Sequence, residues 1–323
     1  MRYLGLRLLQ SLFLLVGVSL LSFVFVEAAP GNFLDEMRLN PQISRQTLAR
    51  LREQYGMDQP LSLRYVHWVK SVARGELGFS FAYNTPVAPL LWSRTRNTLL
   101  LTGSATLMAW LIALPWGIVS AEQRRGWIDS ASSLVTALLL AAPDVMLALG
   151  LLLFAVRTNK LPTGGMMSLA AESESKWGQA KNISVHLLGP MLVLVLISLP
   201  TLLRHVRAAM IEALESPCAR AAQAHGITRA RILFHHALPM AMNPLISLFA
   251  LSLGSLLSAS LLVEVVMSWP GLGPLLLEAI LARDVYVIIG AVMFASLLLI
   301  GGMLLGDVLL FSADPRIRTE GLV

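Results

Sequence analysis

The residues best suited to do chemistry in this chain are polar side chains set inside apolar segments. Asp144 follows Pro143 in the middle of a long apolar run. A carboxylate inside a hydrocarbon layer is costly, so it usually faces a polar cavity or a partner. The alternative is that Asp144 caps a helix that restarts after Pro143. Ser252, Ser255 and Ser258 recur at every third position of another apolar run. They are suited to line a polar path or to pack helices together.

No set of side chains forms a recognisable catalytic or metal-binding motif. The sequence contains no GxxxxGK[ST] phosphate loop, no HExxH zinc motif and no cluster of cysteine and histidine. His235 and His236 are adjacent and therefore point to different sides of a helix. The single cysteine, Cys218, excludes an intramolecular disulfide. We therefore expect neither an enzyme nor a metal site, and no cofactor bound by this chain.

One polar stretch between two apolar runs, Glu212–Pro239, is called the polar segment below. Helix formers from Glu212 to His225 predict a helix with Ala219 and Ala222 on one face. Gly226 is suited to a left-handed stop, and Thr228 is suited to cap a second helix. Leu238 and Pro239 are expected to end that helix and open the next apolar run. Small residues on an exposed helix face allow close approach, so we interpret the polar segment as a docking element.

A different reading of the polar segment is a DNA-binding helix-turn-helix, because its alanine, glycine and isoleucine spacing fits that motif. A segment held between two membrane spans by short flanks would not reach a groove of DNA. We therefore expect no nucleic-acid partner.

Composition places the chain in a membrane. Its 323 residues are 56% hydrophobic and 14% charged, and the mean hydropathy is +0.69. This much apolar surface indicates an integral membrane protein. The formal net charge of +6 comes from arginines on loops, which indicates membrane orientation and contact with anionic lipid.

Six apolar runs have the length of about 20 residues that a bilayer requires. They are Leu8–Val26, Leu99–Val119, Leu134–Val156, Val185–Leu203, Leu245–Val266 and Val287–Phe311. The alternative for the first is a cleaved signal peptide, but it is too long for a typical one. An even number of spans puts both termini on one side, and the arginine bias makes that side, with the polar segment, cytoplasmic. Glycine pairs in the later runs predict close helix packing: Gly302 with Gly306, and Gly254 with Ser258.

These spans divide the chain into four parts. Residues 1–29 hold a cytoplasmic N-terminus and the first span, and residues 30–96 form an extracytoplasmic cap segment. Residues 97–311 form a five-helix core that contains the polar segment at 212–239, and residues 312–323 form a cytoplasmic tail.

The polar segment resembles the cytoplasmic coupling loop of binding-protein-dependent ABC importers, whose pattern is E-A-A-x-x-x-G followed by I-x-L-P. Arg220, Ala221 and Ala222 stand at the first three positions, Gly226 at the glycine, and Leu238-Pro239 at the end. Arg220 replaces the glutamate and His236 the isoleucine. The match is closer to the dipeptide/oligopeptide/nickel branch, where arginine is common at the first position.

The resemblance to that branch extends over almost the whole chain. Glu264–Asp284, with its WPGLG core, and Asp307–Arg318, with DPRIR, are similar to two of its signatures. Pro30–Asn32, Tyr55–Trp68 and Gly75–Phe81 resemble the first of the two permeases in such systems. Met267, Met303 and Leu310 depart from the usual residues.

The resemblance implies an all-α type I ABC importer permease with six transmembrane helices and both termini cytoplasmic, in the bacterial inner membrane. It implies four partners: a second permease, two ATPase subunits that bind the ATP, and an extracytoplasmic substrate-binding protein. The residues implied for coupling are Arg220, Ala221, Ala222, Gly226, Arg229, Leu238 and Pro239. Those implied for a rigid outer turn are Trp269, Pro270, Gly271 and Gly273.

Two questions stay open at the level of sequence. The cargo is a peptide or a similar small solute, with nickel, glutathione or an oligosaccharide as alternatives. The rival class, a stand-alone secondary transporter, would carry inverted repeats with paired broken helices, and the two halves of this chain share no obvious pattern. Arg220, Arg229 and Arg231 are suited either to meet acidic groups on an ATPase or to act only as positive-inside charge.

Overall fold

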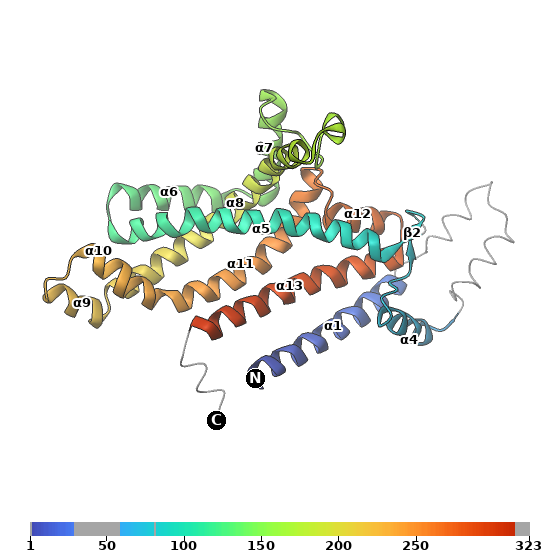
Figure 1. Cartoon of the computed structure of the whole chain (residues 1–323), viewed down its shortest axis with the longest axis horizontal. Helices are drawn as coiled ribbons and strands as arrows, with labels where there is room; N and C mark the ends of the chain where they lie inside the picture. The colour runs from blue at the N-terminus through green and yellow to red at the C-terminus, as the bar shows by residue number, and fades with distance from the viewer. Residues whose placement is uncertain (1, 29–58, 81, 314–323) are drawn as a thin grey trace. The chain divides into compact units, whose positions relative to one another are not determined.

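The chain is built from long apolar helices (Figure 1). The structure is a computed structural model that describes residues 2–28, 59–80 and 82–313. The long helices are α1 (Arg2–Ala28), α5 (Val87–Glu122), α8 (Lys176–Leu214), α11 (Leu238–Val266) and α13 (Val285–Ala313). The shorter α-helices are α4 (Leu61–Val72), α6 (Trp127–Ala141), α7 (Asp144–Thr158), α9 (Pro217–Ala224), α10 (Arg229–Ile232) and α12 (Leu272–Leu281). A 3-10 turn, η1 (Leu169–Ser173), and a π-helical turn, η2 (Leu233–Ala237), complete the helical part.

Among the described residues, five helical stretches are long and apolar enough to cross a membrane, and α6 with α7 makes a sixth if that bent pair is one span. The other five predicted spans lie within α1, α5, α8, α11 and α13. Residues 30–58 of the predicted cap segment and 314–323 of the predicted tail fall outside the described residues.

The third predicted span, Leu134–Val156, is wrong as a single helix. Helix α6 ends at Ala141 and α7 begins at Asp144, and their axes differ by 98°. Ala142 has φ −89° and ψ 123°, the extended backbone that a residue before proline prefers. Pro143 therefore breaks the run into two helices and sets Asp144 at the start of the second.

The chain divides into two compact units. Unit 1 comprises Met1–Tyr3, Leu99–Trp269 and Leu299–Val323, and unit 2 comprises Leu4–Thr98 and Pro270–Leu298.

In unit 1, α8 lies at the centre of the apolar core. Its buried side chains include Leu194, Leu202, Leu203 and Met210, each at most 1% exposed. Helices α6, α7 and α11 pack against it. Since three helices cover α8, its apolar residues lie on several faces and not on a single amphipathic stripe.

Small residues bring α11 and α13 close together within unit 1, as the glycine pairs predict. A Cβ atom on Gly306 would lie 2.0 Å from the Cβ of Ala250, and one on Gly302 would lie 3.2 Å from the Cβ of Leu253. Gly254 faces Leu299 in the same way, at 2.7 Å from its Cδ1. The prediction of close helix packing at these glycines is confirmed.

In unit 2, an aromatic cluster joins α1 to α4. Phe23 lies with its ring centroid 5.4 Å from that of Tyr65 and 5.6 Å from that of Trp68, and the hydroxyls of Ser19 and Tyr65 are hydrogen-bonded at 2.9 Å. Edge-to-face and tilted aromatic pairs of this kind stabilise a helix pair beyond the area they bury.

A buried carboxylate ties a short hairpin to α13, also within unit 2. Strands β1 (Phe79–Ser80) and β2 (Thr85–Pro86) pair antiparallel, with Phe79 opposite Pro86. Asp284, 1% exposed, accepts a hydrogen bond from the Ser80 hydroxyl at 2.7 Å. Its other oxygen accepts from the backbone N–H of Val287 at 3.4 Å, in the first turn of α13. Burial of this acid is thus balanced by hydrogen bonds.

Candidate functional site

The polar segment begins with a helix break that the sequence did not predict. Helix α8 continues to Leu214, and α9 starts only at Pro217, so the single helix expected from Glu212 to His225 is wrong. The Ser216 side chain caps α9 by accepting a hydrogen bond from the backbone N–H of Ala219 at 3.2 Å. Pro217, which has no backbone N–H to lose, fits the first helical position.

The corner after α9 has the left-handed glycine that the sequence predicts. Gly226 has φ 75°, and the N–H of Ile227 donates to the Ala222 carbonyl at 3.2 Å. This bond closes a glycine-ended helix terminus that residues with a Cβ adopt only with strain.

Leu238 and Pro239 open α11, as expected, but the expected helix end before them is wrong. Helix α10 passes through η2 directly into α11, so the stretch Arg229–Val266 is one long helical run. Pro239 lies in the first turn of α11. It cannot donate to an earlier carbonyl, and the π-helical turn η2 directly precedes its helix.

The two alanines that were expected to face outward face inward. Ala219 and Ala222 are 2% and 7% exposed, and they pack with Ile232 into a small core of the polar segment. Interpreting that face as the exposed docking face is therefore wrong. The exposed face of α9 is the other one, and it carries Ala221 and Ala224.

Two arginines assigned to coupling have partners inside the chain. Arg220 donates from Nε to the Glu215 carbonyl at 3.0 Å. Arg229 lies 3.1 Å from a Glu122 carboxylate oxygen through Nε and donates from Nη2 to the Glu122 carbonyl at 2.7 Å. Both side chains stay largely exposed, as does Arg231, so a role against an ATPase stays a prediction.

The four residues proposed for a polar path line one cavity in unit 1. Its volume is about 670 Å³, and its walls include Asp144 from the start of α7 and Ser252, Ser255 and Ser258 from α11. Ser255 and Ser258 are exposed, whereas Ser252 is buried and accepts a hydrogen bond from the Trp110 indole N–H at 3.0 Å. Asp144 is an exposed residue in the first turn of α7 and one of the residues that line this space.

Sequence reasoning missed the third wall of this cavity, which α8 supplies. Ser198, Thr201 and His205 line it, at the i, i+3 and i+7 positions that share one helix face. That spacing was the available signal. His205 donates from Nδ1 to the Thr201 carbonyl at 2.8 Å, which fixes the orientation of its ring.

The residues of the WPGLG motif are held by hydrogen bonds and burial. Trp269 is fully buried in the core of unit 1, and its backbone N–H donates to the Glu264 carbonyl at 2.8 Å. In unit 2, the Pro270 carbonyl accepts from the Asn97 amide at 2.7 Å. Gly271 precedes α12, and Gly273 is buried in its first turn. These contacts are those of a rigid turn, and its predicted outer location stays a prediction.

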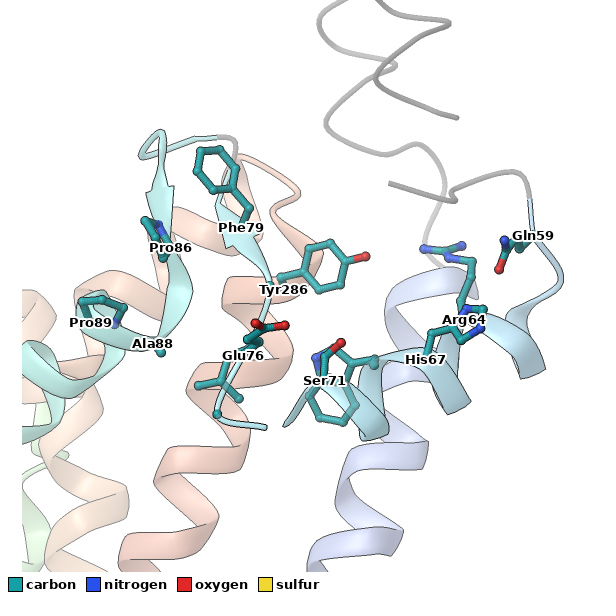
Figure 2. Close-up of a pocket in the computed structure, with 14 residues that line it drawn as sticks. Gln59, Arg64, His67, Ser71, Glu76, Phe79, Pro86, Ala88, Pro89 and Tyr286 are labelled. Atoms are coloured by element: carbon teal, nitrogen blue, oxygen red, sulfur yellow. The ribbon is translucent and has the colours of Figure 1, made fainter. Parts of the chain in front are cut away.

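A larger cavity, of about 800 Å³, lies in unit 2 (Figure 2). Figure 2 shows Arg64 and His67 on α4, and Glu76 and Tyr286 between α4 and the hairpin. No pattern in the sequence singled out these residues. The backbone at Gly78, with φ 102°, passes so close to Tyr286 that a Cβ there would lie 2.8 Å from the ring.

Comparison with protein families decides the class of the chain. Residues 113–319 match the model of the binding-protein-dependent transport system inner membrane component, and residues 1–102 match that of its N-terminal region. The chain belongs to this family. It is a multi-pass inner-membrane permease subunit of an ATP-driven importer, so it serves transport rather than catalysis.

Individual relatives of this permease agree with the family. It is 33% identical over 314 residues to the oligopeptide transport system permease protein AppB of Bacillus subtilis (strain 168), covering 97% of this chain and 98% of that protein. It is 33% identical over 317 residues to the glutathione transport system permease protein GsiC of Escherichia coli O6:H1, covering 97% of both. An inward-facing structure of the MetNI methionine ABC transporter shares the fold, with a TM-score of 0.57, 18% identity and coverage of 70% of this chain and 96% of that one. The predicted type I permease fold is confirmed.

Proposed function

We propose that this permease forms the path for peptide import and is driven through its polar segment by two separate ATPase subunits that bind the ATP. A second, similar permease and an extracytoplasmic substrate-binding protein complete the proposed assembly, with membrane lipid around it. The observation that carries the proposal is the exposed face of α9, which lies on a packed corner between the two longest helical runs, α8 and Arg229–Val266. A force applied at that corner acts on both runs.

The structure of the polar segment supports a docking role in a form different from the one the sequence suggested. Ala219, Ala222 and Ile232 make a core that keeps the corner folded, while Ala221 and Ala224 place small side chains on the exposed face, beside Arg220 and Gln223. A folded corner with small side chains suits insertion into a cleft, because the two alanines lose no side-chain entropy on binding.

The cavity in unit 1 supports a peptide cargo. Its hydroxyls on α8 and α11 suit the amide groups of a peptide backbone, and its leucines suit apolar side chains. Asp144 supplies the negative charge that a free N-terminal ammonium needs. Two relatives named for oligopeptide and glutathione transport agree with a cargo of this size.

Substitution of Ala221 tests the docking role. Ala221→Arg is expected to leave a permease that inserts and pairs with its partner permease, because the side chain points away from the core of the polar segment. Steric exclusion from the ATPase cleft is expected to lower ATPase co-purification and substrate-stimulated hydrolysis at least tenfold, about 1.4 kcal/mol of binding. Ala180→Arg places the same side chain on an exposed face of α8 and should change neither.

A third variant separates docking from folding. Ala222→Arg forces a charge into the core of the polar segment and is expected to lower the amount of permease in the membrane. Full stimulated hydrolysis and transport by Ala221→Arg, at normal abundance, would show that the ATPases do not act through this face.

Substitution of Asp144 tests the path. Asp144→Asn keeps the size of the side chain and removes its charge, so uptake of peptides with a free N-terminus should fall about tenfold, whereas uptake of N-acetylated peptides should change little. Uptake into vesicles that contain the whole complex, normalised to permease abundance, measures both. An equal loss for the two peptide classes would remove Asp144 from the path.

A further inference from the structure

The turn between α5 and α6 is fastened to the membrane helices by one buried carboxylate. Asp129, 6% exposed, accepts hydrogen bonds from the Ser120 hydroxyl at 2.8 Å and from the backbone N–H of Arg125 at 2.9 Å. It also accepts from Arg207 on α8, at 2.5 Å from Nε and 2.9 Å from Nη2. A carboxylate with this many donors holds the end of α5, the turn and the start of α6 in one arrangement against α8.

The same turn reaches out to the polar segment through two ion pairs. Arg124 pairs with Glu215, the first of the two residues between α8 and α9. Arg229 forms an ion pair with the Glu122 carboxylate at 3.1 Å and donates a hydrogen bond to the Glu122 backbone carbonyl at 2.7 Å. Ser216–Ile232 is therefore connected to the end of α5 as well as to the two helices that flank it in the chain.

Between the turn and α9 lies a cavity of about 360 Å³. Glu122, Arg124, Glu215 and Arg229 all line it, together with Ala219 on the other side. The rest of the lining is mostly apolar, and the two ion pairs supply charged contacts across the gap.

We propose that Glu122 and Arg124 are positioning residues that hold the polar segment against the end of α5, so that movement of a docked ATPase is passed to α5 and α6 as well as to α8 and α11. This inference rests on the proposed docking role of the polar segment. In this arrangement the α5–α6 turn, anchored by Asp129, transmits the displacement to α5 and α6.

Loss of these ion pairs should affect coupling rather than folding. Arg124 and Glu215 are 52% and 63% exposed, and exposed pairs contribute little to stability. The polar segment has its own core of Ala219, Ala222 and Ile232, so it stays folded when the ion pairs are removed. Loss of the ion pairs weakens the transmission of movement from the polar segment to α5.

Charge reversal tests the proposal in the whole importer complex. Arg124→Glu and Glu215→Arg each replace attraction by repulsion and are expected to lower substrate-stimulated ATP hydrolysis and transport about fivefold. The ATPases should still co-purify, and the thermal stability of the complex should stay unchanged. The double variant Arg124→Glu with Glu215→Arg restores an opposite pair and should recover most of the stimulated rate.

Arg125→Glu is the matched control, because it reverses an exposed charge on the same turn and keeps the backbone N–H that Asp129 accepts. It should retain full stimulation. A second variant, Glu122→Gln, removes only the carboxylate charge from the pair with Arg229 and should lower stimulation about twofold.

Wild-type stimulation in both Arg124→Glu and Glu215→Arg would overturn the proposal, as would failure of the double variant to recover. Loss of ATPase co-purification in either single variant would also overturn it, by placing that side chain in the docking contact itself. The docking role is judged separately by Ala221→Arg: if that variant abolishes co-purification while the charge reversals change nothing, only the positioning role fails.

Discussion

Replacement of Asp129 by alanine is expected to remove most of the folded permease from the membrane. The substitution leaves the Arg207 guanidinium, 31% exposed at its side chain, without its carboxylate partner. It also leaves the Ser120 hydroxyl and the Arg125 N–H without their acceptor. Breaking a largely buried pair in this way costs about 3 kcal/mol or more, a large share of the roughly 5–15 kcal/mol by which native proteins are stable.

Two companion variants identify the charge as the cause. Asp129→Asn removes the charge and keeps only one of the two acceptor oxygens, for either Ser120 or Arg125, so its loss should be intermediate. Arg207→Met combined with Asp129→Ala removes the stranded cation and should recover part of the abundance. Thermal unfolding of the purified complex and permease abundance in membranes measure the effect. Wild-type values for Asp129→Ala would mean that the α5–α6 turn is anchored by other contacts.

The sequence predicted the helices better than their breaks. Apolar composition located α1, α5, α8, α11 and α13, because the length of a membrane span follows from bilayer thickness. A run of apolar residues has the same composition whether its helix is straight or bent. Leu134–Val156 was therefore predicted as one span, although the axes of its two helices differ by 98°. The local signal for the bend was Pro143, which favours an extended backbone at Ala142 and so interrupts the helix. Composition alone contains no such information.

The polar segment shows where local patterns stop. The corner at Gly226 follows from a glycine and its neighbours, and it was predicted. The inward face of α9 depends on Ile232, which lies beyond the corner, so spacing alone did not distinguish Ala221 from Ala222. The pair between Arg229 and Glu122 joins residues 107 positions apart, and no motif in the sequence connects them.

The cavity in unit 1 was half predicted for the same reason. Ser252, Ser255 and Ser258 share a helix face because of their period, so their common location followed from the sequence. Asp144 joins them through the packing of α7 and α11, which only the structure provides. His205 was overlooked because a histidine at the end of an apolar run is commonly a surface residue.

Addition of one methyl group at Gly306 is expected to separate α11 from α13. A Cβ there would lie 2.0 Å from the Cβ and 3.1 Å from the Cα of Ala250. The second of these atoms is backbone, so no rotamer change relieves the contact. Overpacking of this kind costs about 3 kcal/mol, and it outweighs the roughly 1 kcal/mol that alanine gains over glycine inside a helix. Gly306→Ala should therefore lower the melting temperature of the complex by about 3 °C, because the shift per kcal/mol falls with chain length.

The chain supplies both a control and a rescue for this substitution. Gly301 lies on the same helix, and a Cβ there would meet nothing within 4 Å, so Gly301→Ala should be neutral or stabilising by less than about 1 kcal/mol. Ala250→Gly combined with Gly306→Ala moves the missing methyl group to the other helix and should restore most of the melting temperature. If the melting temperature of Gly306→Ala equals that of Gly301→Ala and is not below that of the wild type, the two helices do not pack at Gly306. The close approach of α11 and α13 would then have to be maintained by Gly254 and Gly302 alone.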